Sequence, residues 1–591
     1  MKTSVRASFE LAEESALKNA TFYAENNSDF CTISKLKTNI TEYVPFMTLE
    51  HNINVLDGTL ETFNSSSYDL SYFSTNLSDE NCVSTNEIVV SLAETYSIYG
   101  ITFDFGNIDF LDQISVDYMK DSEIIKSYDL YPSARYYTAD ISAESFNKVI
   151  IKFKSTRFPR MFTKMQYLYL GKIYNWDDEV LSCDITENLN PISKEIKTNT
   201  CELSVYSEEN DFNVVDPNGP FRYLGKNQKL KLYVDCDGSE YNFGLFFLDT
   251  WDASVKNVIK FNLISPIGIL SRITCYDGWF ALNPIETPYR EGDTVYSALK
   301  KLFDNYTSDI YSNLSYSVSE NLTTPLFGTI PYGDYKKVIQ AIAFCSCASV
   351  NDTRDGVIKV SRIIENESSS EINLNNILGE IKVSLIESPS VVELHYTKYE
   401  YHDKTEDGKY KELTTLNLTK GVKTKITSSK PIEYVRYKKT SSSQWTYLSD
   451  TAYNLYYFDF TPAETATYTF QIIEMESDNS GLHIFDISDK NNQVENVVKI
   501  DSDPLIFHGV DDNGNDNEFI ENIKKYYGNV PYMVEFEFIN NGTIKTGDVV
   551  TVQTDLGYKI KGYLIEQNIS LSGGMISKAK VIGDVVVSDG V

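Results

Sequence analysis

The sequence is short of histidine, tryptophan and cysteine for its length. Its 591 residues include 5 His, 4 Trp and 8 Cys. The cysteines are scattered without a Cys-x-x-Cys pair, which argues against a zinc site and a disulfide framework and predicts buried thiols. No two histidines lie within four residues of each other, so a metal-binding histidine pair on one helix is excluded. We expect no metal and no cofactor.

Sequence motifs of catalysis are missing as well. There is no glycine-rich phosphate loop with lysine, no His-Glu-x-x-His and no Gly-x-Ser-x-Gly. The acidic stretch 511–521 is superficially like a calcium loop, but with Gly514 in the required glycine position the first ligand would fall on Gly509. Carboxylates are abundant, and no pair stands out as a glycosidase pair. We therefore predict a protein that is not an enzyme, with no catalytic residue.

Positive charge and long apolar runs are also scarce. Lys and Arg number 53 against 84 Asp and Glu, a net charge of −31. This balance argues against a surface that grips nucleic acid or anionic lipid. No run of 18 apolar residues occurs, which predicts no membrane span. The first twenty residues lack the apolar core of a secretory signal, so we expect cytoplasmic synthesis without a signal peptide.

Strand-forming residues, in contrast, are plentiful. The chain has 42 Tyr and 31 Phe, and with Val, Ile and Thr these favour β-structure. Its length is too great for one core, so the sequence predicts a mainly β, multidomain protein.

The first third divides into two predicted parts. Residues 1–86 contain apolar positions near helical spacing between Phe9 and Ala24, which predict a short amphipathic helix, followed by an irregular segment. Residues 87–174 contain seven short alternating strands, typical of an antiparallel sandwich. The order of these strands resembles a galactose-binding-like jelly roll, a scaffold that serves either for sugar binding or as a spacer. The candidates for glycan contact at its loop ends are Asp104, Tyr136, Tyr137 and Arg157.

In the remainder of the chain, the spacing of apolar residues changes between that of strands and that of helices, and these changes mark the predicted boundaries. Residues 175–290 are all β, and 291–379 form an α+β unit whose first helix has an apolar stripe beginning at Val295, with Asp293 or Thr294 as the N-cap. Strands return in 380–400 and in 500–591. Between them, the short strands of 401–499 predict an inserted immunoglobulin-like β-sandwich.

Three stretches in this order carry a second resemblance. They are the segment from Ile185 to Leu270, GDYKKVIQAIAFCSCASVNDTRDGVIKVSRI, and KTGDVVTVQTDLGYKIKGYLIEQNISLSGGMISKAKVIGDV. Together they resemble the baseplate hub or tail-tip proteins of phage tails and contractile injection systems, in the form found in Gram-positive hosts. The resemblance implies two tail-tube-like β-barrels, 175–290 and 380–400 plus 500–591, with the α+β unit between them.

The same resemblance implies a structural role. Three copies would form a homotrimeric ring that joins the tail tube to the tip or spike of a virion or tail-like particle. The implied partners are the tail-tube, tape-measure, spike and other baseplate proteins, with DNA only as cargo that does not stick to an acidic lumen. The resemblance does not decide between a contractile phage tail, a non-contractile phage tail and a tail-like bacteriocin. The alternative is a glycan-binding protein built of several β-modules.

The resemblance also supplies candidate interface residues. They lie in two turns, one after the first strand of the first barrel and its counterpart in the second barrel. The residues are Asn188, Leu189, Asn190 and Pro191, and Ser570, Leu571, Gly573 and Gly574.

Overall fold

The fold is taken from a computed structural model of the chain. It describes residues 3–12, 16, 20–29, 31–37, 71–105, 111–207, 212, 219–225, 227–275, 279–280, 293–309, 314–326, 329–330, 333–363, 369–386, 389–400, 402–449, 455–486, 497–501, 517–528, 531–555, 557–571 and 574–586. Within these residues the chain is mainly β and multidomain, as the sequence predicts.

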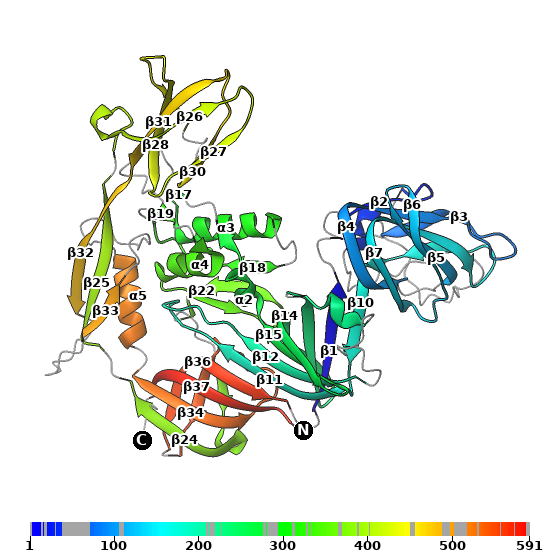
Figure 1. Ribbon diagram of the computed structural model, residues 1–591. Coiled ribbons are helices and arrows are strands. Elements are labelled where there is room, and N and C mark those ends of the chain that lie inside the picture. The colour runs from blue at the N-terminus through cyan, green and yellow to red at the C-terminus, as the bar shows by residue number, and fades with distance from the viewer. Residues whose placement is uncertain are drawn as a thin grey trace.

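The largest feature is one continuous sheet of 13 described strands in the lower part of Figure 1. Its order is β10-β1-β13-β14-β15-β12-β11-β36-β37-β34-β24, with β35 beside β36 and β23 beside β35. The first seven strands are β10 (Gly171–Trp176), β1 (Thr3–Ala12), β13 (Lys229–Cys236), β14 (Ser239–Val255), β15 (Val258–Ile264), β12 (Thr200–Tyr206) and β11 (Val180–Asn188). The remaining six are β36 (Lys559–Ser570), β37 (Ile576–Val585), β34 (Tyr532–Ile539), β24 (Ile377–Leu385), β35 (Val549–Gln553) and β23 (Ser369–Ile372).

The two parts of this sheet each curl around a core of their own. In the first part, side chains from β1 and β11 join the same buried cluster, and these two strands lie in contact. In the second part, Ile372 of β23 packs with Phe536 of β34 and Val552 of β35. We call the first part the N-sheet and the second part the C-sheet.

Two strands correct the prediction of an N-terminal helix over Phe9–Ala24, because β1 runs to Ala12 and Thr21–Tyr23 forms the strand β2. The side chains of Val5, Ala7, Phe9 and Leu11 are all buried, which is a period of two. The helical spacing in the sequence came from the apolar residues after Ala12, whereas the residues before Ala12 alternate with a period of two. β1 pairs with β10 and β13, so the first residues of the chain belong to the N-sheet.

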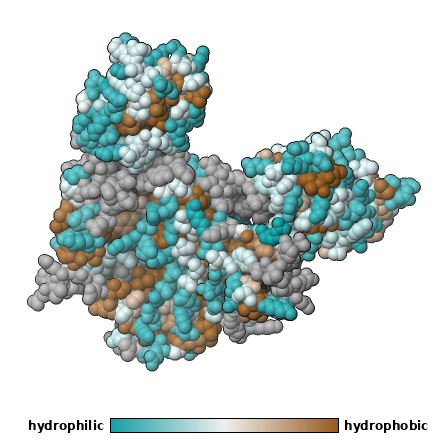
Figure 2. Space-filling view, in the orientation of Figure 1, coloured by the Kyte–Doolittle hydropathy of each residue, from teal (hydrophilic) through white to brown (hydrophobic). Residues whose placement is uncertain are grey.

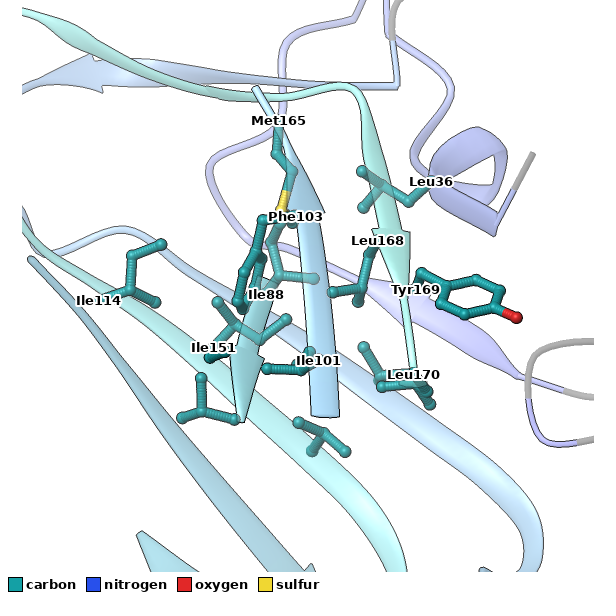
Figure 3. Close-up of a cluster of buried hydrophobic side chains, with 14 of the residues drawn as sticks. Leu36, Ile88, Ile101, Phe103, Ile114, Ile151, Met165, Leu168, Tyr169 and Leu170 are labelled. Carbon is teal, nitrogen blue, oxygen red and sulfur yellow. The ribbon is translucent and has the colours of Figure 1, made fainter. Parts of the chain in front are cut away.

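The part predicted to be a jelly-roll-like sandwich is a two-sheet β-unit inserted between β1 and β10. Figure 3 shows its core, where Ile88, Phe103 and Leu168 point toward one another. The insertion begins well before residue 87, because β2 and β3 belong to it. Its main sheet contains β2 (Thr21–Tyr23), β4 (Glu87–Asp104), β7 (Tyr136–Thr156), β5 (Leu111–Lys120), β6 (Glu123–Leu130) and β9 (Tyr167–Tyr169), and its second sheet contains β3 (Tyr72–Leu77) and β8 (Phe162–Met165).

The α+β unit packs on the N-sheet and begins before the predicted residue 291, because Thr274 and Cys275, predicted to belong to the first barrel, pair with Asp334 and Gly333. Its first helix is α3 (Val295–Asp309), and the side chains of the predicted apolar stripe are buried. Thr294 Oγ1 accepts a hydrogen bond from the Ser297 N–H at 3.2 Å, which confirms Thr294 as a cap. The other elements are α2 (Pro266–Leu270), α4 (Tyr335–Phe344), β16 (Thr274–Cys275), β17 (Trp279–Phe280), β18 (Ser315–Val318), β19 (Thr329–Ile330), β20 (Gly333–Asp334), β21 (Ser349–Asp352) and β22 (Val357–Ser361).

Two predicted boundaries differ around the C-sheet. β23, placed by sequence in the α+β unit, pairs with β35. β25 (Val391–Glu400), placed by sequence in the second barrel, lies instead in a three-stranded sheet with β32 (Glu476–Asp486) and β33 (Val497–Asp501), against helix α5 (Asn517–Gly528). The alternating pattern shows that a segment is a strand, but it does not show which sheet the strand joins.

The predicted insertion is a two-layered β-unit between β25 and β32, at the top of Figure 1. Phe458 and Phe470, one from each layer, lie in its core. The larger sheet has the order β26 (Lys411–Leu418), β31 (Ala466–Glu474), β28 (Ile432–Lys439) and β29 (Thr446–Tyr447), and the smaller sheet pairs β27 (Thr424–Thr427) with β30 (Tyr457–Phe460). The insertion therefore ends before β32 and is shorter than the predicted 401–499.

Candidate functional site

The N-sheet and the C-sheet meet at one pair of strands. β11 pairs with β12 on one side and with β36 on the other, in the antiparallel register Asp184↔Ser570 to Asn188↔Glu566. β36 is long enough to pair with β35 along its first half and with β11 along its second. We call this β11–β36 junction the seam. It makes two barrel-like units into a single hydrogen-bonded sheet.

A carboxylate lies on the buried face of the seam. Along β11 the inward positions are Cys183, Ile185 and Glu187, so Glu187 occupies a place where the pattern calls for an apolar residue. Its counter-charge is Arg354, in the turn between β21 and β22. That turn is tight: Gly356 has φ +77° and its N–H donates to Thr353 O at 2.9 Å.

Arg354 is held by partners from both sheets. Its Nε donates to Glu187 Oε1 at 2.7 Å and its Nη2 to Glu187 Oε2 at 3.3 Å. Its Nη1 and Nη2 also donate to the carbonyls of Gly542 and Ile544, at 2.7 and 3.1 Å. The guanidinium carbon lies 4.2 Å from the ring centroid of Phe243 in β14. The N-sheet, the C-sheet and the α+β unit are thus fixed to one another at this residue.

The electrostatics of the pair favour the charged form. Burial alone raises the pKa of Glu187, but the Arg354 charge and hydrogen bonds from Arg354, Gln567 and the Thr546 N–H together bring it below its usual value. Since only 4% of the Arg354 side chain and 8% of the Glu187 side chain are exposed, solvent does little to screen the pair.

The polar contacts continue from Glu187 into the C-sheet. Gln567 Nε2 of β36 donates to Glu187 Oε2 at 2.6 Å, and Gln567 Oε1 accepts from Asn540 Nδ2 at 3.3 Å. Asn540 Nδ2 also donates to Ser577 Oγ of β37 at 2.9 Å. Strands β11, β36 and β37 and the loop after β34 are therefore connected by buried side chains. This arrangement positions the strands of the two sheets relative to one another.

The first predicted turn lies at one end of the seam. The Leu189 N–H donates to Ile565 O at 2.8 Å, and the Leu189 side chain is 5% exposed. The Asn188 N–H donates to Asn199 Oδ1 at 2.8 Å. Asn190 Oδ1 accepts from the backbone of Lys194 at 3.1 Å, and Pro191 is buried. These residues make contacts within the chain.

The second predicted turn lies at the opposite end of the seam. The Leu571 N–H donates to Cys183 O at 2.9 Å, and Ser570 pairs with Asp184. Gly574 has φ +155°, while Gly573 lies outside the described residues. The structure thus brings both predicted turns to one junction. Their role toward another subunit stays a prediction.

The four candidates for glycan contact do not form one site. Asp104 and Tyr136 are cross-strand partners in β4 and β7, and Tyr137 pairs with Phe103. Arg157 instead follows the other end of β7, where its guanidinium carbon lies 5.8 Å from the ring centroid of Phe158. Asp104 is 4% exposed. The sequence indicated that these residues lie near the ends of strands, but it did not show that Arg157 lies at the opposite end of β7 from Tyr136 and Tyr137.

The described residues contain no cluster of metal ligands, and the two cysteines of the Cys-Ser-Cys stretch are buried. No group of three or more His, Cys, Asp or Glu side chains there could hold a metal ion. Cys345 and Cys347 are fully buried, and burial raises the pKa of Cys347 well above its ordinary value, so it is unreactive. Most of the calcium-loop-like stretch 511–521 lies outside the described part. None of the described helices has the length and apolarity needed to cross a membrane.

A second buried carboxylate lies two residues before Arg354. Asp352, at the end of β21, accepts hydrogen bonds from the Ile267 N–H at 3.2 and 3.3 Å and so caps the short helix α2. Burial raises the pKa of Asp352 to about 7, against opposing effects of Ser265, the Ile267 N–H and the Lys336 charge. It joins α2 to β21 within the α+β unit through a carboxyl group whose pKa is raised to near neutral.

Comparisons with known proteins were made by sequence and by structure. No family model matches the chain, and no curated protein matches it. Among solved structures, the 43 kDa tail protein of prophage MuSo2 from Shewanella oneidensis has 10% identity and a TM-score of 0.37, with 70% of this chain and 96% of that chain covered. The prophage tail protein gp18 from Listeria monocytogenes EGD-e has 6% identity and a TM-score of 0.37, covering 70% and 91%.

A third similar structure is the E. coli c3393 protein, described as a component of the type VI secretion system. It has 7% identity and a TM-score of 0.32, with 70% of this chain and 74% of that chain covered.

Proposed function

We propose that this chain is a structural protein of a phage tail or tail-like particle, the baseplate hub, and that it has no enzymatic activity. The observation that carries the proposal is the seam. One chain supplies two curved units of a continuous sheet, fixed to each other by the buried Glu187–Arg354 pair. Three copies of such a chain would present six units, which matches a tube with six-fold symmetry.

The free edge of the sheet supports assembly into a ring. β24 is at the end of the described sheet order, and most of its side chains are half-buried or exposed. Val383 and Leu385 are 41% and 72% exposed. An edge strand with unpaired backbone groups and exposed apolar side chains is a template for pairing with another chain. Figure 2 shows hydrophobic patches over the lower sheets, where β24 and β34 lie.

The charge of the chain supports a passage role for the assembled ring. A net charge of −31 repels the phosphate backbone, so DNA would pass without binding. The partners would be the tail-tube, tape-measure and spike proteins of the particle. The alternative role as a glycan-binding protein is weakened for the jelly-roll-like sandwich, because its candidate residues are not gathered in one site.

The test is the mass of the assembled protein. We expect sedimentation of the full chain over a range of concentrations to show a species of three times the monomer mass. Leu385→Asp places a charge on the β24 edge and should shift that species toward the monomer. Leu482→Asp is the matched control, since Leu482 is 49% exposed on a different sheet.

A stable monomer at every concentration, which also fails to join tail tubes, would contradict the hub role. If both substitutions disturb the trimer equally, the hub role would still hold, but β24 would not be part of the interface between subunits.

A further inference from the structure

The outer face of the larger sheet of the insertion carries a row of polar and aromatic side chains. Tyr447 of β29 is opposite Arg436 of β28, and Arg436 is opposite Gln471 of β31. Residues directly opposite each other in a sheet share a face. The other face holds Val435, Phe470 and Ile472 in the core, so the row faces outward. We call this surface, with the residues added below, the outer face.

Aromatic rings and cations are interleaved at one end of this face. The guanidinium carbon of Arg436 lies 3.8 Å from the ring centroid of Tyr410 and 4.6 Å from that of Trp445. The ammonium nitrogen of Lys438 lies 4.5 Å from the Trp445 centroid. Trp445 is half-buried and Tyr447 is 46% exposed, so both rings have surface left for a ligand.

Hydroxyl and amide groups continue the outer face across β31 and β26. Thr415 Oγ1 of β26 donates to Thr469 Oγ1 of β31 at 3.1 Å, and Thr467 donates to the side chain of Asn417. Arg436 Nε donates to Gln471 Oε1 at 2.9 Å. Both Thr415 and Asn417 are exposed. A sugar has an apolar ring face and hydroxyl edges, so a glycan of several sugars can contact both the exposed rings at one side of the sheet and these polar groups on β26.

The charge of the insertion differs from that of the rest of the chain. Residues 401–475 contain ten Lys and Arg against nine Asp and Glu, whereas the whole chain has a net charge of −31. The insertion as a whole is thus close to neutral. The carboxylates at the outer face are engaged there, because Asp407 pairs with Arg436 and Glu412 accepts from Thr415 Oγ1 at 3.0 Å. In the view of Figure 2 the insertion presents mostly hydrophilic and intermediate residues.

We propose that the outer face binds a glycan that carries acidic groups, either carboxylate or phosphate. A sugar ring packs against Trp445 and Tyr447, and an acidic group of the glycan pairs with Lys438. Thr415 and Asn417 bond to its hydroxyls. The proposal does not depend on the hub role, because it requires only the folded insertion.

The experiment measures binding of the full chain to immobilised polymers by biolayer interferometry. The acidic probes are polygalacturonate, hyaluronate and a glycerol-phosphate polymer that carries sugars, and the comparison probes are dextran, a neutral glucan, and polyphosphate, which has no sugar. We expect binding to at least one acidic glycan and much weaker binding to dextran and polyphosphate. Trp445→Ala and Lys438→Gln should each weaken that binding about ten-fold, the size expected for the loss of a stacked ring or a charged hydrogen bond.

Lys425→Gln is the matched control. Lys425 also places its ammonium over a ring, 4.0 Å from the centroid of Tyr457, but on the smaller sheet. It should leave binding unchanged. Lys438→Gln keeps a long polar side chain, so it tests the site even if Trp445→Ala unfolds the insertion.

Three results would overturn the proposal. The first is no binding to any of the acidic glycans. The second is binding to dextran or polyphosphate as strong as to the acidic glycan. The third is equal loss in the Lys425→Gln and Lys438→Gln variants, which would show a general charge effect.

Discussion

Two arginines of this chain have similar surroundings and different partners. Arg354 lies over Phe243 at the seam and Arg436 lies over Tyr410 in the insertion, with ring distances of 4.2 and 3.8 Å. Their side chains are 4% and 7% exposed. The carboxylates differ: Glu187 is 8% exposed, whereas Asp407, the partner of Arg436, is 82% exposed.

The difference shows which arginine holds the fold together. A buried carboxylate cannot recover its hydration when its partner is removed, so the Glu187–Arg354 pair must be complete. An exposed carboxylate returns to water at little cost. At the seam, charge therefore fixes the arrangement of the sheets, whereas in the insertion the buried charge of Arg436 is balanced by a carboxylate that remains in water.

The largest expected effect is at the seam. Arg354→Met keeps the length of the side chain and leaves Glu187 buried without its counter-charge. We expect a loss of about 3–5 kcal/mol in the free energy of unfolding. Urea unfolding followed by fluorescence measures it. Arg6→Met is the control, because Arg6 is 47% exposed and pairs with exposed carboxylates, so it should cost at most about 1 kcal/mol.

A double variant sharpens this test. Adding Glu187→Leu to Arg354→Met removes the stranded charge and should recover much of the loss. If Arg354→Met costs no more than Arg6→Met, the contrast between buried and exposed pairs is wrong for this chain.

The two residues of this pair were not equally visible in the sequence. Glu187 follows Cys183 and Ile185 in the inward phase of an alternating strand, and a carboxylate in that phase is a signal of a buried partner. Arg354 lies in a turn beside Gly356, where arginines are ordinarily solvated, so nothing local identifies it. The pairing is set by how three parts of the chain meet, which is information that no local window contains.

In the rest of the fold, too, local features were predictable from the sequence and long-range pairing was not. The helix α3 and the strands of the insertion were predictable because their periodicity is local. Membership of β1 and β23 in the large sheet was not, since strand pairing across hundreds of residues leaves no local trace.

The next effect concerns Asp352, two residues before Arg354. Its pKa rises from 3.8 in the unfolded chain to about 7 in the fold, so its contribution to stability is fully present below about pH 4 and is lost as the pH rises to about 7. Asp352→Asn is neutral at every pH and can still accept from the Ile267 N–H. We expect the variant to match the wild type near pH 4 and to exceed it by on the order of 2–4 kcal/mol at pH 8.

Urea unfolding at several pH values measures this difference. Asp252→Asn is the control at an exposed site, where hydrogen bonds from Ser254 lower the pKa of Asp252. It should show no gain at pH 8. A gain of Asp352→Asn that is the same at pH 4 and pH 8 would mean that the carboxylate is not the titrating group.

A smaller effect is expected in the insertion. Arg436→Met removes the contacts with Tyr410, Trp445 and Gln471 but leaves Asp407 in water. We expect a loss of about 1–2 kcal/mol, confined to residues 402–475. Hydrogen exchange of the full chain reports it as faster exchange in β28 and β31 alone. Faster exchange along the seam as well would show that the insertion and the large sheet unfold together. The contributions of Arg354 and Arg436 to stability could then not be separated.

The smallest effect is expected for Lys438, the neighbour of Arg436 on the outer face. Lys438 is half-buried and lies over Trp445 near the end of β28, so Lys438→Gln should change the free energy of unfolding by less than about 0.5 kcal/mol. Thermal unfolding of the full chain checks this. An unchanged stability together with weaker glycan binding would separate a ligand contact from a structural one. A loss as large as that of Arg436→Met would instead mean that the outer face is part of what holds the insertion together, because a residue available to a ligand should cost the fold little when it is replaced.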